Sequence, residues 1–144
     1  RDPQYLARAT AKAIEVLSRN PRGFVLMVEG SEIDDAGHNN STSMVTNEIL
    51  DLDRAVAVAR KFAADNGKTL IVVTADHETG GMSIIEGNLE KKEVDAAFSF
   101  EGHSGVMVPV FAYGPGAIEF TGIQDNTEIF HDMYRLLFPD KKRK

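Results

Sequence analysis

The sequence contains no cysteine and no tryptophan. The absence of cysteine excludes disulfide bonds, thiolate metal sites and cysteine nucleophiles. No run of apolar residues approaches the ~20 that a membrane-spanning helix needs. Positive charge is also scarce, because 16 Lys and Arg residues face 22 Asp and Glu residues, which gives a net charge of −6. This balance argues against binding to nucleic acid or to anionic membranes.

The rest of the composition is that of an ordinary globular domain. The 144 residues are 42% hydrophobic and 26% charged, which is close to the globular average. A chain of this length can bury a sizeable core. Because the sequence opens at Arg1 rather than at a methionine, we expect it to be processed or to be part of a longer protein.

Helical and extended patterns alternate along the chain. Three stretches have apolar residues at helical spacing and predict helices: 2–17, 43–66 and 127–138. Three apolar runs without this spacing predict strands at 24–28, 69–74 and 106–113, of which the first two are expected to be buried. Between them, 86–105 is expected to be a polar loop, and 140–144 a basic tail.

This order predicts an α/β fold, layered, with a mostly parallel sheet flanked by helices. Buried parallel strands need neighbours on both sides. We therefore expect the sheet to be part of a larger one.

Acidic residues and histidines gather where the predicted strands end. Six of them stand there or in the adjoining loops: Glu29, Asp34, His38, Asp76, His77 and His103. In open α/β sheets, ligands bind beyond the carboxyl ends of the strands. Imidazole and carboxylate without thiolate suit zinc, manganese, iron or cobalt, and two such ions close together form a clamp used in phosphoryl-group hydrolysis.

Each of these residues alone has a simpler explanation. An aspartate after a strand commonly caps a helix, and a single histidine is commonly a hydrogen-bonded surface or core residue. The combination is what favours a metal site, since Asp34 and His38 are four residues apart and one helical turn would direct both at one point. We expect a structural role for His131, which lies within the last predicted helix.

Four motifs occur in series along the chain. They are V-E-G-S-E-I-D-D-A-G-H at 28–38, T-A-D-H-E-T-G-G at 74–81, H-S-G followed by V-P-V-F-A-Y-G-P-G-A within 103–117, and N-T-E-I-F at 126–130. All four resemble motifs of the alkaline phosphatase family, in the family's order and over nearly the whole chain. The resemblance implies an enzyme that hydrolyses phosphate monoesters through a phosphoserine intermediate, with two zinc ions and one magnesium ion.

The resemblance also implies which residues hold each ion. Asp34, His38 and His103 would bind the first zinc, Asp76 and His77 the second, and Glu29 the magnesium. The family's nucleophilic serine and phosphate-binding arginine belong to an earlier segment that this sequence lacks. Residues 1–139 are therefore expected to be the C-terminal portion of the catalytic domain, without the N-terminal half. The family further implies a homodimer and a periplasmic or secreted location.

One position departs from the family. Asp35 follows the predicted zinc ligand, where relatives often carry Lys, His or Trp near the phosphate. Its charge could weaken phosphate binding, order water around the magnesium or simply face solvent.

Three other readings remain open from the sequence. One is a phosphomutase or phosphodiesterase of the same superfamily, and another is a zinc-binding fragment without catalysis. The third is a structural domain whose carboxylates are helix caps.

Overall fold

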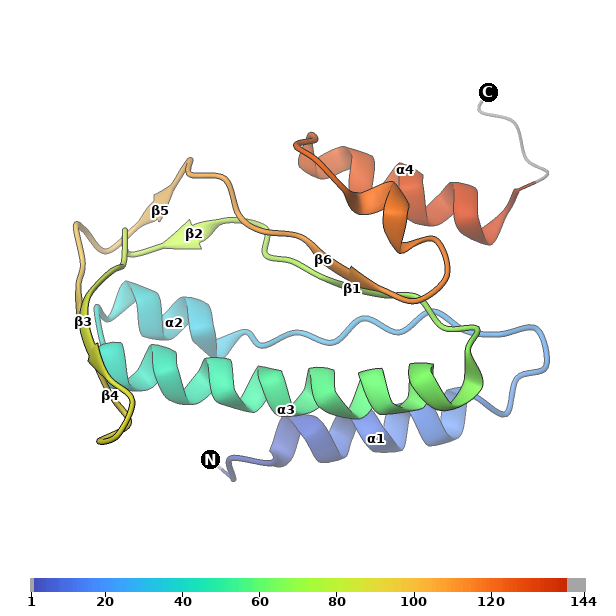
Figure 1. The fold of residues 1–144 in the computed structure, drawn as a ribbon, viewed down its shortest axis with the longest axis horizontal. Coiled ribbons are helices and arrows are strands. Elements are labelled where there is room, and N and C mark those ends of the chain that lie inside the picture. The colour runs from blue at the N-terminus through green and yellow to red at the C-terminus, as the bar shows by residue number, and fades with distance from the viewer. Residues whose placement is uncertain (1, 140–144) are drawn as a thin grey trace. The chain divides into compact units, whose positions relative to one another are not determined.

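The computed structural model of the chain describes residues 2–139 and leaves the expected basic tail, 140–144, outside the described residues. Figure 1 shows its elements, which in chain order are α1 (Tyr5–Leu17), α2 (Glu32–His38), α3 (Thr42–Asn66), β1 (Ile71–Val73), β2 (Glu78–Thr79), β3 (Ser83–Asn88), β4 (Glu93–Ala97), β5 (His103–Ser104), β6 (Phe111–Tyr113), η1 (Ala117–Phe120) and α4 (Asn126–Leu137).

The chain forms two compact units. The first contains the residues up to 61 together with 77–107, and the second contains 62–76 together with the residues from 108 onward. The first unit buries Ile14, Ala36, Val45 and Ala55, and the second buries Ala63 and Phe120. None of the helices within residues 2–139 combines the length and apolar character that crossing a bilayer would require.

The three predicted helices are confirmed as α1, α3 and α4. Helix α3 ends at Asn66, as predicted, and the backbone N–H of Gly67 then donates to the carbonyl oxygen of Ala63 at 2.9 Å. Helix α4 begins beside Asp125, whose carboxylate accepts the backbone N–H of Thr127 at 3.0 Å. This bond to an otherwise unpaired helical N–H caps the helix and keeps the pKa of Asp125 below its usual value.

Every strand pair among the described residues is antiparallel. β1 pairs with β6, β2 with β5, and β3 with β4. The described part of the chain therefore has α/β content, with helices and small antiparallel sheets, but it contains no parallel pair.

The strand predictions were right in two places and wrong in one. β1 is the centre of the strand predicted at 69–74, and it pairs with β6, which is the C-terminal end of the strand predicted at 106–113. Residues 24–28 are assigned no strand, and within them Val25 and Met27 are 72% and 85% exposed. The prediction of a strand buried on both faces fails because an apolar run shows only what a segment could bury. It does not supply the neighbouring strands that would cover it.

The polar loop predicted at 86–105 is also wrong in part, because β3 and β4 form a hairpin there. Its register runs from Ser83 opposite Ala97 to Asn88 opposite Glu93, with an irregularity between Ile84 and Glu86. All six residues of β3 are exposed. A strand that buries neither face has no reason to alternate apolar and polar residues, so the periodicity could not reveal it.

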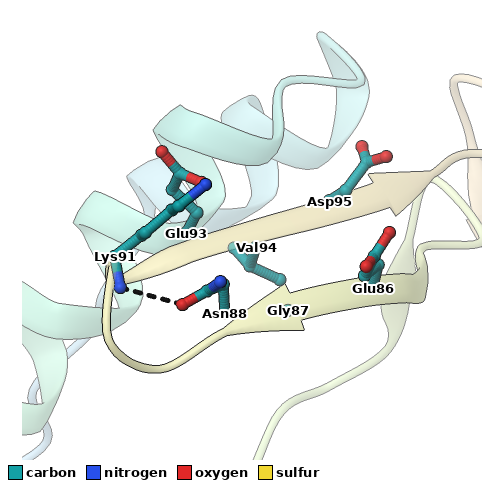
Figure 2. Close-up of a pocket in the computed structure, with 7 residues that line it drawn as sticks. All are labelled: Glu86, Gly87, Asn88, Lys91, Glu93, Val94 and Asp95. Carbon is teal, nitrogen blue, oxygen red and sulfur yellow. Dashed lines mark hydrogen bonds between the residues drawn. The ribbon is translucent and has the colours of Figure 1, made fainter.

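The turn of this hairpin is closed by the backbone N–H of Lys91, which donates to Asn88 Oδ1 at 2.9 Å (Figure 2). A hollow of about 430 Å³ lies on the hairpin and is lined by Glu86, Gly87, Asn88, Lys91, Glu93, Val94 and Asp95. The lining contains none of the predicted metal ligands, so this hollow is not part of the candidate site.

Within the second unit, the end of β6 comes very close to the residues that lead into β1. Gly114 has φ +103°, and a Cβ added there would overlap the carbonyl oxygen of Thr69. Only a residue without a side chain allows both this backbone conformation and this approach.

We expect Gly114→Ala to destabilise the protein strongly, and Gly122→Ala is the matched control. Gly122 also has a positive φ, +93°, but no atom lies within 4 Å of its added Cβ. Backbone strain alone should cost about 1–2 kcal/mol in the control, and overlap should add about 1–3 kcal/mol for Gly114→Ala. Urea unfolding of both variants measures the difference, and equal losses would contradict the close approach.

Candidate metal centre

Helix α2 places two of the predicted ligands on one face. Asp34 and His38 are one turn apart, and Asp34 Oδ2 lies 3.3 Å from His38 Nε2. The helical turn that the spacing predicted is therefore confirmed.

A short strand pair brings two more histidines to this face. In the β2–β5 register, Thr79 lies opposite His103. The His103 ring stacks on the ring of His77, with centroids 3.6 Å apart and planes at 20°. His103 Nε2 lies 3.4 Å from Asp34 Oδ1 and 3.0 Å from His38 Nε2. We call Asp34, His38, His77 and His103 the histidine–aspartate cluster.

Helix α2 and β2 touch at Gly37. A Cβ added to Gly37 would stand 2.9 Å from Thr79 Cβ and 3.0 Å from the Thr79 carbonyl oxygen. Gly37 is buried, and its lack of a side chain is what allows the helix to approach the strand so closely.

Two neighbours orient the cluster. The Nδ1 of His38 lies 2.5 Å from the carbonyl oxygen of Glu101. A carbonyl can only accept, so Nδ1 carries the hydrogen and the neutral ring presents the lone pair of Nε2 to the cluster. The Thr79 hydroxyl lies 2.5 Å from Asp34 Oδ1 and 3.2 Å from His77 Nδ1.

These contacts shift the pKa values of two residues of the cluster, Asp34 and His38. The pKa of Asp34 is held below its usual value chiefly by the Thr79 hydroxyl. The pKa of His38 is raised, first by its bond to the Glu101 carbonyl and then by the charges of Asp34 and Asp35. The cluster therefore keeps an anionic carboxylate that attracts a cation.

Glu78 holds the strand pair in place beside the cluster. One carboxylate oxygen accepts the Ser104 hydroxyl, and the other accepts the backbone N–H of Met82 at 3.1 Å. These bonds, of which the one from Ser104 has the largest effect, keep the pKa of Glu78 below its usual value. Glu78 thus ties the residue after His103 to the turn that follows β2.

The donor atoms of the cluster fit a zinc ion. Zinc prefers four ligands in a tetrahedron at about 2.0–2.1 Å from nitrogen and oxygen, which places ligand atoms about 3.3 Å from one another. The Nε2 atoms of His38 and His103 lie 3.0 Å apart, and each faces a different oxygen of Asp34, Oδ2 at 3.3 Å and Oδ1 at 3.4 Å respectively. Their side chains are 42%, 36% and 46% exposed, so an ion can reach them.

A second group of possible metal ligands shares Asp34 and His103 with the first group. Donor atoms of Asp34, His77 and His103 lie within 4.8 Å of one another. Both sets contain Asp34 and His103, so the geometry leaves His38 and His77 as candidates for the third ligand beside them.

Three predicted site residues lie outside the cluster. Glu29 and Asp35 are exposed residues of the first unit, and Glu29 has no place among the converging donor atoms of residues 2–139. Asp76 precedes His77 in the chain but is the last residue of its segment of the second unit. His131 lies in α4, as predicted.

A family model described as alkaline phosphatase matches two overlapping segments of the chain, residues 1–94 and 85–138. The chain belongs to the alkaline phosphatase family. Membership implies metal cofactors, and the histidine–aspartate cluster is a group that could hold them.

Individual relatives agree with this assignment. Alkaline phosphatase H of Pseudomonas aeruginosa is 38% identical, over 94% of this chain and 32% of the relative. The structure of the alkaline phosphatase from the Antarctic bacterium TAB5 has a TM-score of 0.85 and 44% identity, over 93% of this chain and 41% of that one. A variant of the TAB5 enzyme with magnesium bound has a TM-score of 0.86 and 42% identity, over 95% and 42%. The chain spans about a third of the length of the curated relatives it matches.

Reasoning from the sequence missed the residues that orient the ligands. Thr79 and Glu78 stand inside the T-A-D-H-E-T-G-G motif, but neither is a usual zinc ligand, so the search for ligands passed over them. The signal that could have found them is their position directly after His77, where a strand would carry them alongside the site.

We expect Glu78→Gln to destabilise the protein by about 1 kcal/mol at pH 7, because it removes a charge-assisted acceptor. A lowered folded-state pKa stabilises the fold above the unfolded value, and this stability is lost as the pH falls through the folded value. The difference from the parent protein should therefore shrink below about pH 4.

Unfolding of the metal-free protein between pH 7 and pH 3 measures this difference. Glu90→Gln, at an exposed position, is the control and should leave the stability unchanged. A Glu78→Gln deficit that stays constant with pH would show that the charge of Glu78 does not stabilise the strand pair.

Proposed function

We propose that the protein containing this chain is a metal-dependent phosphatase that hydrolyses phosphate monoesters, and that this chain supplies metal ligands but not the nucleophile. The observation that supports this most is the convergence of Asp34, His38 and His103, in which the two Nε2 atoms lie 3.0 Å apart and each lies within 3.4 Å of one oxygen of Asp34. The three residues come from two segments 65 residues apart in the chain. Carboxylates that only capped separate helices would not need to lie beside two histidines from different segments.

The family resemblance assigns the ions. Asp34, His38 and His103 would hold one zinc, Asp76 and His77 would contribute to a second, and Glu29 would bind magnesium. A similar protein, the variant of the TAB5 enzyme, has magnesium bound. Three protein ligands on the first zinc leave a fourth position for water or substrate.

When bound, such ions act as Lewis acids that stabilise charge on the phosphoryl oxygens and on the attacking and leaving groups. The chain's own residues prepare this site. Asp34 supplies the negative charge that draws the cations in, and the Glu101 carbonyl fixes the His38 ring with Nε2 toward the cluster. The pair between Glu78 and Ser104 keeps His103 in register beside Thr79.

The remainder of the protein would complete both the site and the sheet. The nucleophilic serine and the arginine that binds phosphate would come from it. We further propose that the full protein has a larger, mostly parallel sheet and that its other segments cover Val25 and Met27, which are exposed apolar side chains in the described residues. The homodimer and the periplasmic or secreted location remain predictions from the family.

Replacing His38 or His103 by Ala in the full-length enzyme should remove about one equivalent of zinc and most of the activity. Loss of a group that merely orients a ligand costs ~10–100-fold in metal affinity, and loss of the ligand itself should cost at least that. His131→Ala, in α4, is the matched control and should retain the metal. Zinc content measured after dialysis decides the assignment, which is wrong if both variants keep the parent's zinc and activity.

Residues 1–144 alone, loaded with zinc, should not turn over a phosphomonoester. The family's nucleophilic serine belongs to a segment that this sequence lacks, and the hydroxyl of Ser104, next to His103, donates to Glu78. A colorimetric assay of released phosphate tests this. Turnover near the ~10 per second typical of enzymes would contradict the assigned role of this chain.

A further inference from the structure

Thr79 occupies a position between two members of the histidine–aspartate cluster. Its hydroxyl oxygen lies 2.5 Å from Asp34 Oδ1 and 3.2 Å from His77 Nδ1. We propose that Thr79 is a positioning residue that fixes both the carboxylate of Asp34 and the tautomer of His77 for metal binding. This inference rests on the proposed function, because it takes the cluster to be a metal site.

The direction of each hydrogen bond at Thr79 follows from the hydrogens that the three groups carry. A hydroxyl has one hydrogen to donate and lone pairs with which to accept, whereas an ionised carboxylate can only accept. The Thr79 hydrogen must therefore point to Asp34. The hydroxyl then faces His77 with a lone pair, so the contact is a hydrogen bond only if Nδ1 of His77 carries the hydrogen.

The consequence for His77 follows directly. A neutral imidazole with hydrogen on Nδ1 has its lone pair on Nε2. His77 is thereby held in the form whose Nε2 can bind a metal, just as the Glu101 carbonyl holds His38. One hydroxyl thus orients a ligand from α2 and a ligand from the segment before β2 at the same time.

The packing around Thr79 leaves the hydroxyl little freedom. Its Cβ and Cγ2 stand where a side chain on Gly37 would be, at 2.9 and 3.0 Å from the added Cβ. The methyl group therefore rests against helix α2. The backbone of Thr79 is held as well, because it pairs with His103 in β2–β5.

The test uses the full-length protein and Zn²⁺ as the probe. Thr79→Val keeps the shape and removes the hydroxyl, whereas Thr79→Ser keeps the hydroxyl and removes the methyl group. Thr46→Val is the matched control, because the Thr46 hydroxyl donates only to the Thr42 carbonyl within α3, at 2.8 Å. Zinc affinity is measured by competition with a chelator, and the tautomer of His77 by ¹⁵N spectra of the metal-free protein.

We expect Thr79→Val to weaken zinc binding ~10–100-fold and to remove the preference of His77 for hydrogen on Nδ1. Thr79→Ser and Thr46→Val should behave like the parent protein in both measurements. The proposal is overturned if Thr79→Val binds zinc as tightly as the parent protein, or if His77 keeps its tautomer. It is also overturned if Thr79→Ser is as defective as Thr79→Val, because the methyl contact would then be the cause.

Failure of the proposed function would look different. In that case the parent protein itself would not bind zinc at the cluster or would not hydrolyse phosphate monoesters. A parent enzyme that does both, with a Thr79→Val variant unchanged in zinc affinity and tautomer, would reject only the role of Thr79.

Discussion

The carboxylate of Asp34 is the point at which the separate segments of the first unit meet. It lies within 3.5 Å of imidazole nitrogens of His38 and His103 and accepts the hydroxyl of Thr79. The negative charge therefore links α2, β2 and β5, elements too short to be stable alone. Helix α2 can approach β2 this closely only because Gly37 has no side chain. The contact between Thr79 of β2 and the charged carboxylate of Asp34 therefore depends on this close packing.

This arrangement explains which parts of the fold could be predicted from the sequence. Helices α1, α3 and α4 carry their signal locally, as apolar spacing, and Asp34 and His38 follow from the turn of a single helix. The β2–β5 pair has only two residues in each strand and joins positions about 25 residues apart. No local pattern encodes such a pairing, since its stability comes from Glu78, Thr79 and the loop between them.

The strand predicted at 24–28 shows that a strong local pattern is not sufficient to form a strand. There the local pattern is strong, yet Val25 and Met27 are exposed within the described residues. The apolar character of a segment indicates how much its burial would stabilise the fold. This stabilisation is gained only where another surface of the protein covers the segment. For the same reason, the six ligand candidates could be chosen by chemistry, but their grouping had to come from the folded chain. His77 proved to stack on His103, which no spacing rule suggested.

The β3–β4 hairpin shows where this chain can tolerate a change of length. Its strands are hydrogen-bonded to each other, all of β3 is exposed, and Leu89 near its tip is 97% exposed. The two family-model matches also overlap at 85–94, within this hairpin. Among the described residues nothing buries Leu89, so a loop or affinity tag inserted at the tip would displace no packed side chain there. The tip is thus an attachment point that leaves the residues of the histidine–aspartate cluster unchanged.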